Sequence, residues 1–202
     1  MAQGLDPRFR PAPLDPAVLA ERFGIDRPFV LCAGTLEVRK NLAGALRAFA
    51  ALGEDARDHQ LVVVGGRGWM NDEFAALLEA VRERVVVTGY VSDDDLVGLL
   101  GSAACFLYPS FLEGFGFPPL EAMACGTPVV TSTGGSVPEV CDDAALLVDP
   151  TDVEGMADAV RRVLADPALA ADLRRRGLER AARLSWSRCA GETVAVYRAV
   201  AS

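Results

Sequence analysis

Residues 105–131 read CFLYPSFLEGFGFPPLEAMACGTPVVT, and this stretch decides the fold. It opens with the apolar run Cys105–Tyr108, passes through a loop with two glycines, enters a short helix expected from Glu121 to Cys125, and closes with the apolar run Pro128–Thr131. Short, continuously apolar strands joined through a helix are typical of a parallel sheet covered on both faces.

The same alternation extends over the rest of the chain. Apolar runs predict further strands at 29–33, 61–64, 85–87 and 145–148, and periodic apolar positions predict helices at 16–23, 41–52, 74–81, from 93, 137–140, 153–164, 169–184 and 186–201. We therefore expect a doubly wound, Rossmann-like α/β fold with its ligand at the carboxyl ends of the strands. Residues 1–27 read as a proline-rich lead-in, 28–185 as the α/β domain and 186–202 as a C-terminal helix.

Composition narrows the class of protein. The 202 residues are 51% hydrophobic and 24% charged, as in a globular α/β domain. No apolar run approaches the ~20 residues of a membrane-spanning helix, and the first residues do not form a secretory signal. We expect a cytoplasmic protein that reaches the inner membrane, if at all, through another domain. The net charge of −8 argues against a nucleic-acid partner.

The sequence holds few residues that could bind a metal or form a Ser/His/Asp triad. The five cysteines are scattered without a Cys-x-x-Cys pair, and His59 is the single histidine. The run Asp93–Asp95 resembles acidic clusters that hold a divalent metal, but it follows Ser92 at a predicted helix start, where carboxylates and a serine cap are favourable. We expect neither a metal nor another cofactor.

The glycine loop of the opening stretch predicts a ligand site. A helix start after two glycines offers backbone N–H groups to a phosphate. The carboxylates of Glu113 and Glu121 would repel a phosphate, so they suit hydroxyl groups: Glu121 a ribose diol, and Glu113 a sugar hydroxyl. The alternative is a plain strand–turn–helix connection with two exposed glutamates.

A second loop, Gly34–Asn41, carries the cations Arg39 and Lys40 before a helix that Asn41 is suited to cap. These cations suit a diphosphate, or they are simply solvated. Arg67, in the turn 65–68, either approaches a phosphate or is exposed.

These segments together resemble retaining glycosyltransferases of family 4. Glu113–Glu121 resembles the Glu-x7-Glu motif of that family, Gly34–Asn41 its first phosphate loop, and Gly89–Leu96 its base-binding loop. Gly135–Glu139 matches a further family segment, and Gly4–Phe9 resembles the link that enters the second domain.

The resemblance implies one half of a GT-B fold, namely the C-terminal domain that binds the nucleotide-sugar donor. Lys40 would bind the diphosphate, Glu113 the donor sugar, Glu121 the ribose, and Tyr90 and Val91 the base. The residues implied in donor binding are Gly34, Thr35, Arg39, Lys40, Arg67, Tyr90, Val91, Glu113, Gly114, Phe115, Gly116, Phe117 and Glu121, with Glu113 and Lys40 acting in catalysis.

One position departs from the family pattern. Many members carry arginine after the loop glycine, where this chain has Thr35, so Arg39 or Arg67 would have to compensate. The variant of this loop resembles members that transfer mannose or related sugars, which favours GDP-mannose over UDP-linked donors.

The implied reaction is transfer of a hexose, with retention and without a metal, to a glycan or lipid-linked acceptor. It would need an N-terminal GT-B domain, in the same or a separate chain, toward which the helix at 186–202 would pack. Alone, the chain is expected to be inactive or nearly so. Two alternatives remain: a non-catalytic nucleotide-sugar-binding module, and a GT-B sugar-nucleotide epimerase.

Overall fold

A six-stranded parallel sheet forms the centre of the molecule. The computed structural model describes residues 3–35, 37–65 and 72–201. The strands lie in the order β3-β2-β1-β4-β5-β6, and each neighbouring pair is parallel. Their bounds are β1 Phe29–Ala33, β2 Gln60–Val64, β3 Val85–Gly89, β4 Cys105–Tyr108, β5 Val129–Ser132 and β6 Leu146–Val148.

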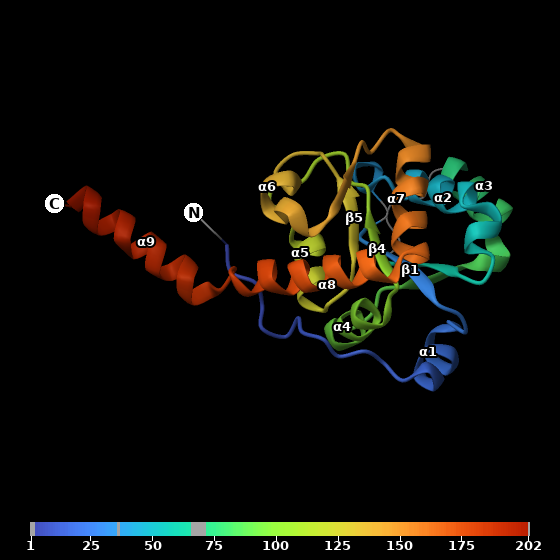
Figure 1. Cartoon of the computed structure of the whole chain (residues 1–202), viewed down its shortest axis with the longest axis horizontal. Helices are drawn as coiled ribbons and strands as arrows, with labels where there is room; N and C mark the ends of the chain where they lie inside the picture. Colours follow the sequence, from blue (N-terminus) through green and yellow to red (C-terminus); the bar gives the residue numbers. More distant parts are fainter. Residues whose placement is uncertain (1–2, 36, 66–71, 202) are drawn as a thin grey trace.

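Helices cover both faces of this sheet (Figure 1). Their bounds are α1 Pro16–Phe23, α2 Leu42–Ala51, α3 Asp72–Ala80, α4 Asp93–Ser102, α5 Phe117–Ala124, α6 Val137–Cys141, α7 Val153–Ala165, α8 Pro167–Ala182 and α9 Trp186–Ala201. Four short 3₁₀ turns complete the described elements: η1 Val38–Lys40, η2 Gly53–Ala56, η3 Arg82–Arg84 and η4 Asp142–Ala144.

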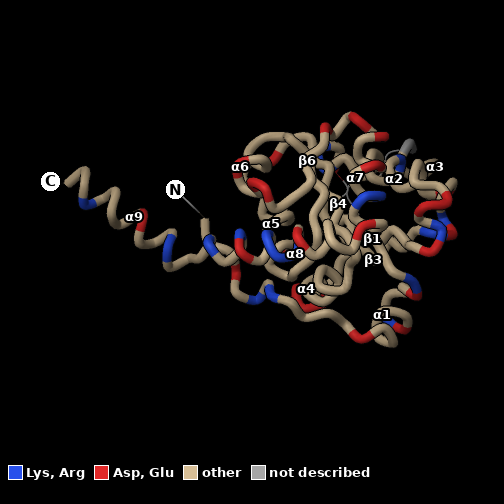
Figure 2. The backbone as a smooth tube through the Cα atoms, in the orientation of Figure 1, with Lys and Arg blue, Asp and Glu red and all other residues tan. Residues whose placement is uncertain are grey.

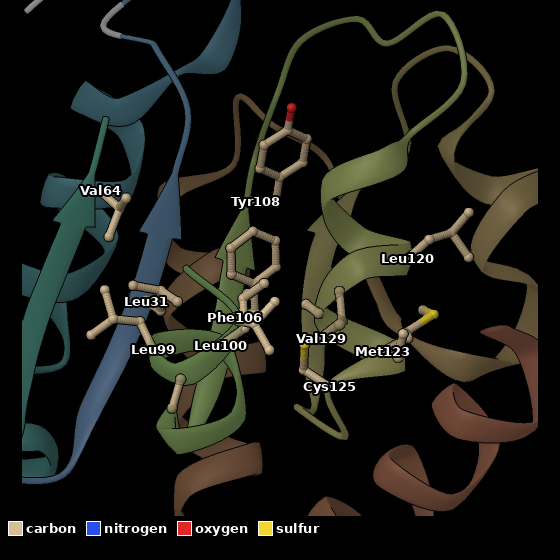
Figure 3. Close-up of a cluster of buried hydrophobic side chains, with 14 of the residues drawn as sticks. Leu31, Val64, Leu99, Leu100, Phe106, Tyr108, Leu120, Met123, Cys125 and Val129 are labelled. Carbon is tan, nitrogen blue, oxygen red and sulfur yellow. The ribbon is translucent and has the colours of Figure 1, made fainter. Parts of the chain in front are cut away.

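Two separate apolar clusters fill the two sides of the sheet, as a doubly wound fold requires. One packs the sheet against α4, α5 and α6, and part of it is drawn in Figure 3, where Phe106 of β4 lies near Val129 of β5 and Leu100 of α4. The other packs the sheet against α2, α3 and α7. Strands buried on both faces explain why the sequence runs are apolar at every position rather than at every second one. The predicted fold class is confirmed.

The order of the strands reverses between β1 and β4. From β1 the chain winds outward through β2 to β3, then returns to place β4 on the other side of β1 and winds outward again to β6. The loops that follow β1 and β4 consequently diverge at this point. Ligands of open α/β sheets bind in the crevice at such a reversal, so the loops after Ala33 and Tyr108 occupy the expected position.

Charged residues on the outer helix α8 pair with one another. Arg175 contacts Asp172 at 2.8 Å and Glu179 at 2.9 Å, and Figure 2 shows acidic and basic residues intermixed along this helix. Pairs three and four positions apart support a solvent-facing helix by a few tenths of a kcal/mol each, roughly 0.2–0.5. These pairs therefore stabilise α8 locally.

The helix α9 projects away from the domain (Figure 1), and none of its residues is buried. Its apolar side chains Trp186, Val194, Val196, Tyr197 and Val200 are exposed. At its base the lead-in pairs with the chain just before α9: the N–H of Leu5 donates to the carbonyl of Leu184 at 3.0 Å. Gly4 lies against Trp186, where a Cβ would approach the ring to 2.5 Å.

Most predicted elements are confirmed, and one boundary needs a correction. The helix that follows the glycine loop begins at Phe117, four residues before Glu121, with prolines at its second and third positions. Proline is well tolerated in a first helical turn because the N–H groups there have no intrahelical acceptor.

Candidate functional site

The site lies where β1 and β4 run side by side. Val30 of β1 pairs with Cys105 of β4, and Leu31 with Phe106, so the loops after these strands leave the same edge of the sheet together. The loop after β1 leads into η1, which carries Arg39 and Lys40. The loop after β4 carries Glu113 and leads into α5. The sheet order thus brings together residues that are 73 positions apart.

Glycine is required where the first loop meets the second strand end. Gly34 donates its N–H to the carbonyl of Val64 at 2.9 Å, and Gly65 has φ +157°. A Cβ on Gly65 would lie 1.8 Å from the carbonyl oxygen of Gly34. The two loops therefore pack backbone to backbone, and the path of the Gly34 loop depends on the missing side chain.

Thr35, which stands where relatives of the expected type carry arginine, is engaged with its own loop. Its hydroxyl donates to Glu37 at 2.8 Å, and this hydrogen bond is the main reason that the pKa of Glu37 is lowered. Glu37 in turn pairs with Arg39 at 3.2 Å. The structure therefore places Arg39 beside Lys40 at the site, whereas Arg67 lies outside the described residues.

Glu113 gathers four hydrogen-bond donors on a single oxygen. Its Oε1 accepts from Arg39 at 2.9 Å, Lys40 at 2.8 Å, Tyr108 at 2.8 Å and Ser110 at 2.7 Å. Lys40 also donates to the hydroxyl of Tyr108. Within the described part of the chain, no donor contacts the second oxygen, Oε2. A sugar hydroxyl could therefore reach Oε2 without displacing these four contacts.

Lys40 is the only lysine among the 202 residues. The side chains of Lys40 and Glu113 are only 11% and 10% exposed. Burial alone would raise the pKa of Glu113, but the hydrogen bonds from Lys40, Ser110 and Tyr108 outweigh it and hold the pKa below its usual range. Glu113 is consequently ionised at neutral pH.

The glycine loop offers backbone donors. Among the described residues, no group accepts from the N–H of Gly114, Phe115 or Gly116. The expectation that the helix start adds several N–H groups needs refinement, because Pro118 and Pro119 have none, so Phe117 is the sole donor of the first three helical positions. Four consecutive residues, 114–117, therefore concentrate the available donors at one end of α5.

A second glycine segment supports this loop from behind. A Cβ on Gly134 would lie 2.3 Å from the carbonyl oxygen of Phe111, and one on Gly135 would lie 2.4 Å from that of Glu113. The Ser136 N–H and hydroxyl both lie within hydrogen-bonding distance of the Glu113 carbonyl, at 3.3 and 3.2 Å. The backbone of Glu113 is thus held from one side while its carboxylate is held from the other.

Glu121 differs sharply from Glu113. It lies on α5, partly buried, and in the described part of the chain no group donates a hydrogen bond to its carboxyl. Burial, then the nearby carboxylates of Asp93 and Asp6, raise its pKa to about 7. A desolvated carboxyl without a partner is suited to accept hydrogen bonds from a ligand, such as those of a diol.

The segment expected to hold a base lies at the start of α4. Tyr90 is 82% exposed, and Val91 packs partly against the core. Ser92 caps α4 by accepting from the N–H of Asp95, and Arg8 of the lead-in pairs with Asp93. The capping interpretation of 93–95 is therefore confirmed.

Sequence reasoning missed two members of the site. Tyr108 was assigned only to the strand, and Ser110 only to the loop, although both contact Glu113. The available signal was a polar aromatic residue at the carboxyl end of an otherwise apolar strand. Figure 3 shows the hydroxyl of Tyr108 pointing beyond the end of the core cluster.

In residues 3–35, 37–65 and 72–201, no group of three or more His, Cys, Asp or Glu side chains is arranged to hold a metal ion. In the same ranges, no helix is both long and apolar enough to span a membrane.

The chain is similar to a known family and to several known proteins. The family model described as "Glycosyl transferases group 1" matches residues 20–180. The chain is 42% identical over 173 residues to the O-antigen chain mannosyltransferase B of Escherichia coli, covering 84% of this chain and 45% of that protein. It is 36% identical over 176 residues to a GDP-mannose-dependent alpha-(1-6)-phosphatidylinositol monomannoside mannosyltransferase of Mycolicibacterium smegmatis, covering 81% and 46%.

A solved structure matches in fold. The C-terminal domain of a glycosyl transferase group 1 family protein from Francisella tularensis superimposes with a TM-score of 0.78 at 21% identity, covering 89% of this chain and 97% of that one. The chain spans less than half the length of the two curated relatives.

Proposed function

Because this chain belongs to the family of group 1 glycosyl transferases, we propose that it is the donor-binding half of a retaining GT-B glycosyltransferase that transfers a hexose to a glycan or lipid-linked acceptor. The observation that carries this proposal is the meeting of Arg39, Lys40 and Glu113 beside the backbone donors of the glycine loop, at the sheet reversal.

The geometry suits a nucleotide-sugar donor. The cations of η1 and the N–H groups of residues 114–117 would bind the diphosphate and stabilise the charge that develops as it leaves. The open oxygen Oε2 of Glu113 would accept from a hydroxyl of the donor sugar, and Glu121 from the ribose. Tyr90 and Val91 would contact the base. Glu113 and Lys40 are the residues to which we assign catalytic roles.

Mannose is the sugar favoured by the relatives. Both curated relatives are mannosyltransferases by name, and the second is named for GDP-mannose. We therefore propose GDP-mannose as the donor and no metal requirement.

A second domain is part of the proposal. The two relatives are more than twice as long as the region they share with this chain. The exposed apolar side chains of α9, Trp186 and Tyr197 among them, have no contact that buries them here. We propose that this helix packs toward an N-terminal GT-B domain, which contributes to the acceptor site and is needed for transfer.

Calorimetric titration with GDP, UDP and ADP in the absence of divalent metal tests the donor assignment. We expect saturable binding of GDP, and tighter or altered binding of GDP-mannose. Adding the N-terminal half of the E. coli relative should then allow transfer of mannose to be measured. Binding without any transfer would favour a non-catalytic module, and release of a changed sugar nucleotide would favour an epimerase.

A further inference from the structure

The four donors on Glu113 fall into two kinds. Arg39 and Lys40 are cations, and Arg39 has a side chain that is 43% exposed. Tyr108 and Ser110 are neutral hydroxyl groups on residues that are 2% and 0% exposed. The ring of Tyr108 is fixed by stacking on Phe106, with ring centroids 5.7 Å apart. The cations stand at the ends of long side chains with several rotatable bonds, whereas the hydroxyls belong to buried residues.

A bound diphosphate would compete for the two cations. It carries more negative charge than one carboxylate, and both cations lie at the loop that faces it under the proposed function. If they turned to the phosphates, Glu113 would remain as a nearly buried carboxylate beside a second anion. Desolvation and like charge would then both raise its pKa.

Only the hydroxyls could oppose this change. The hydroxyl of Ser110 also lies 3.0 Å from the carbonyl of Arg39 and 3.4 Å from that of Leu112, but the carboxylate at 2.7 Å is its nearest acceptor. The hydroxyl of Tyr108 donates to Glu113 while it accepts from Lys40. It therefore touches both members of the ion pair and keeps its bond to Glu113 when Lys40 departs.

We infer that Tyr108 and Ser110 are positioning residues that keep Glu113 ionised and correctly oriented while Arg39 and Lys40 transfer their contacts to the diphosphate of the donor. This inference rests on the proposed function. In the free chain all four donors hold the carboxylate, and the two hydroxyls become decisive in the complex with a ligand that carries a diphosphate.

The test compares Tyr108→Phe, Ser110→Ala and the double variant with the unmodified chain, by calorimetry from pH 5 to pH 8. Each variant is titrated with GDP and with GDP-mannose, and its loss of affinity relative to the unmodified chain is plotted against pH. The ionisation of the ligand and that of Glu121 are common to both proteins and cancel in this ratio. The other charged groups facing Glu113 are Arg39 and Lys40, with Glu37 behind Arg39.

We expect the double variant to lose at least fivefold more affinity for GDP-mannose at pH 8 than at pH 5, because at pH 5 its Glu113 takes up a proton in the complex, and this uptake offsets part of the loss. Its loss for GDP should change with pH in the same direction, because GDP carries the same diphosphate. Tyr197→Phe, an exposed tyrosine of α9, is the matched control. A pH-independent loss for GDP-mannose would overturn the inference while leaving the proposed function intact. If the unmodified chain bound neither ligand, the proposed function itself would fail.

Discussion

The ammonium group of Lys40 lies 2.8 Å from the Oε1 oxygen of Glu113, and both side chains are about nine-tenths buried. A donor diphosphate must therefore draw Lys40 away from an existing partner rather than meet a free cation. Removing either partner of such a buried pair leaves a charge with less compensation, which is costly. Under the proposed function, Lys40 binds the diphosphate and Glu113 competes for Lys40. Substitutions of these two residues should therefore have opposite effects on nucleotide binding.

Lys40→Met should weaken the binding of GDP by roughly 10- to 100-fold, which corresponds to about 1.5–3 kcal/mol for a hydrogen bond to a charged group. Calorimetry at pH 7.5 measures this loss. Arg57→Met removes an exposed cation and is the matched control, with no expected effect. Equal affinity in the Lys40 variant would exclude Lys40 from the phosphate site.

Glu113→Gln should bind GDP as tightly as the unmodified chain or a few-fold more tightly, since Lys40 and Arg39 lose their carboxylate partner. It should at the same time lose the additional affinity that the sugar provides. An amide oxygen accepts a weaker hydrogen bond from a sugar hydroxyl than a carboxylate oxygen does. Parallel titrations with GDP and GDP-mannose separate the two effects. Equal losses for both ligands would refute the assignment of Glu113 to the sugar.

Glu121 should make donor binding depend on pH. Its pKa of about 7 means that it is largely protonated at pH 6 and largely ionised at pH 8. The ionised form accepts both hydrogen bonds of a ribose diol, so the affinity for GDP-mannose should rise across this range. In Glu121→Gln the affinity should be lower and flat with pH, and a slope that survives in this variant would show that another group is responsible.

The same carboxyl should lower stability at high pH. Its pKa is raised from 4.5 to about 7 on folding, so between these values the folded chain holds a proton that the unfolded chain has released. Ionisation therefore costs folding free energy as the pH rises through this window, by at most about 3 kcal/mol. Glu121→Gln should raise the melting temperature at pH 8 and leave it nearly unchanged at pH 4.5. A gain that is the same at both values would contradict the linkage.

Gly65→Ala should destabilise the domain by about 3 kcal/mol or more, because the new Cβ would collide with the carbonyl of Gly34. Gly53→Ala is the control: Gly53 also has a positive φ, but nothing lies within 4 Å of its added Cβ. Urea unfolding of both variants gives the difference. Similar losses would mean that the two loops can move apart, and would remove the argument that Gly65 sets the path of the Gly34 loop.

The sheet and most of its helices could be predicted because apolar runs and helical periodicity are local properties of the sequence. The order of the strands is not a local property. The contact between Lys40 and Glu113 could therefore not be predicted, because it depends on β1 and β4 being neighbours. Glu113 and Lys40 were identified separately as site residues, and the structure places them at one site. Tyr108 was missed since a tyrosine that ends an apolar strand does not differ, in sequence, from a core residue.

The start of α5 shows a second limit. The helix was predicted to begin at Glu121, yet it begins at Phe117, and two prolines occupy its second and third positions. Proline fixes φ near the helical value and lacks only an N–H that the first turn does not use. The composition of a segment alone does not show whether prolines delay a helix or begin it.

Because Lys40 is unique among the 202 residues, labels specific for lysine side chains report on this site alone. Lysine labelled with nitrogen-15 would give one side-chain ammonium resonance, and its exchange with solvent and its chemical shift would report directly on the partner of that group. Reductive methylation would place a probe at this position and at the amino terminus alone. Under the proposed function, any coupling of Lys40 to an amine-reactive surface would occupy the donor site, so immobilised binding assays should attach the chain through another residue.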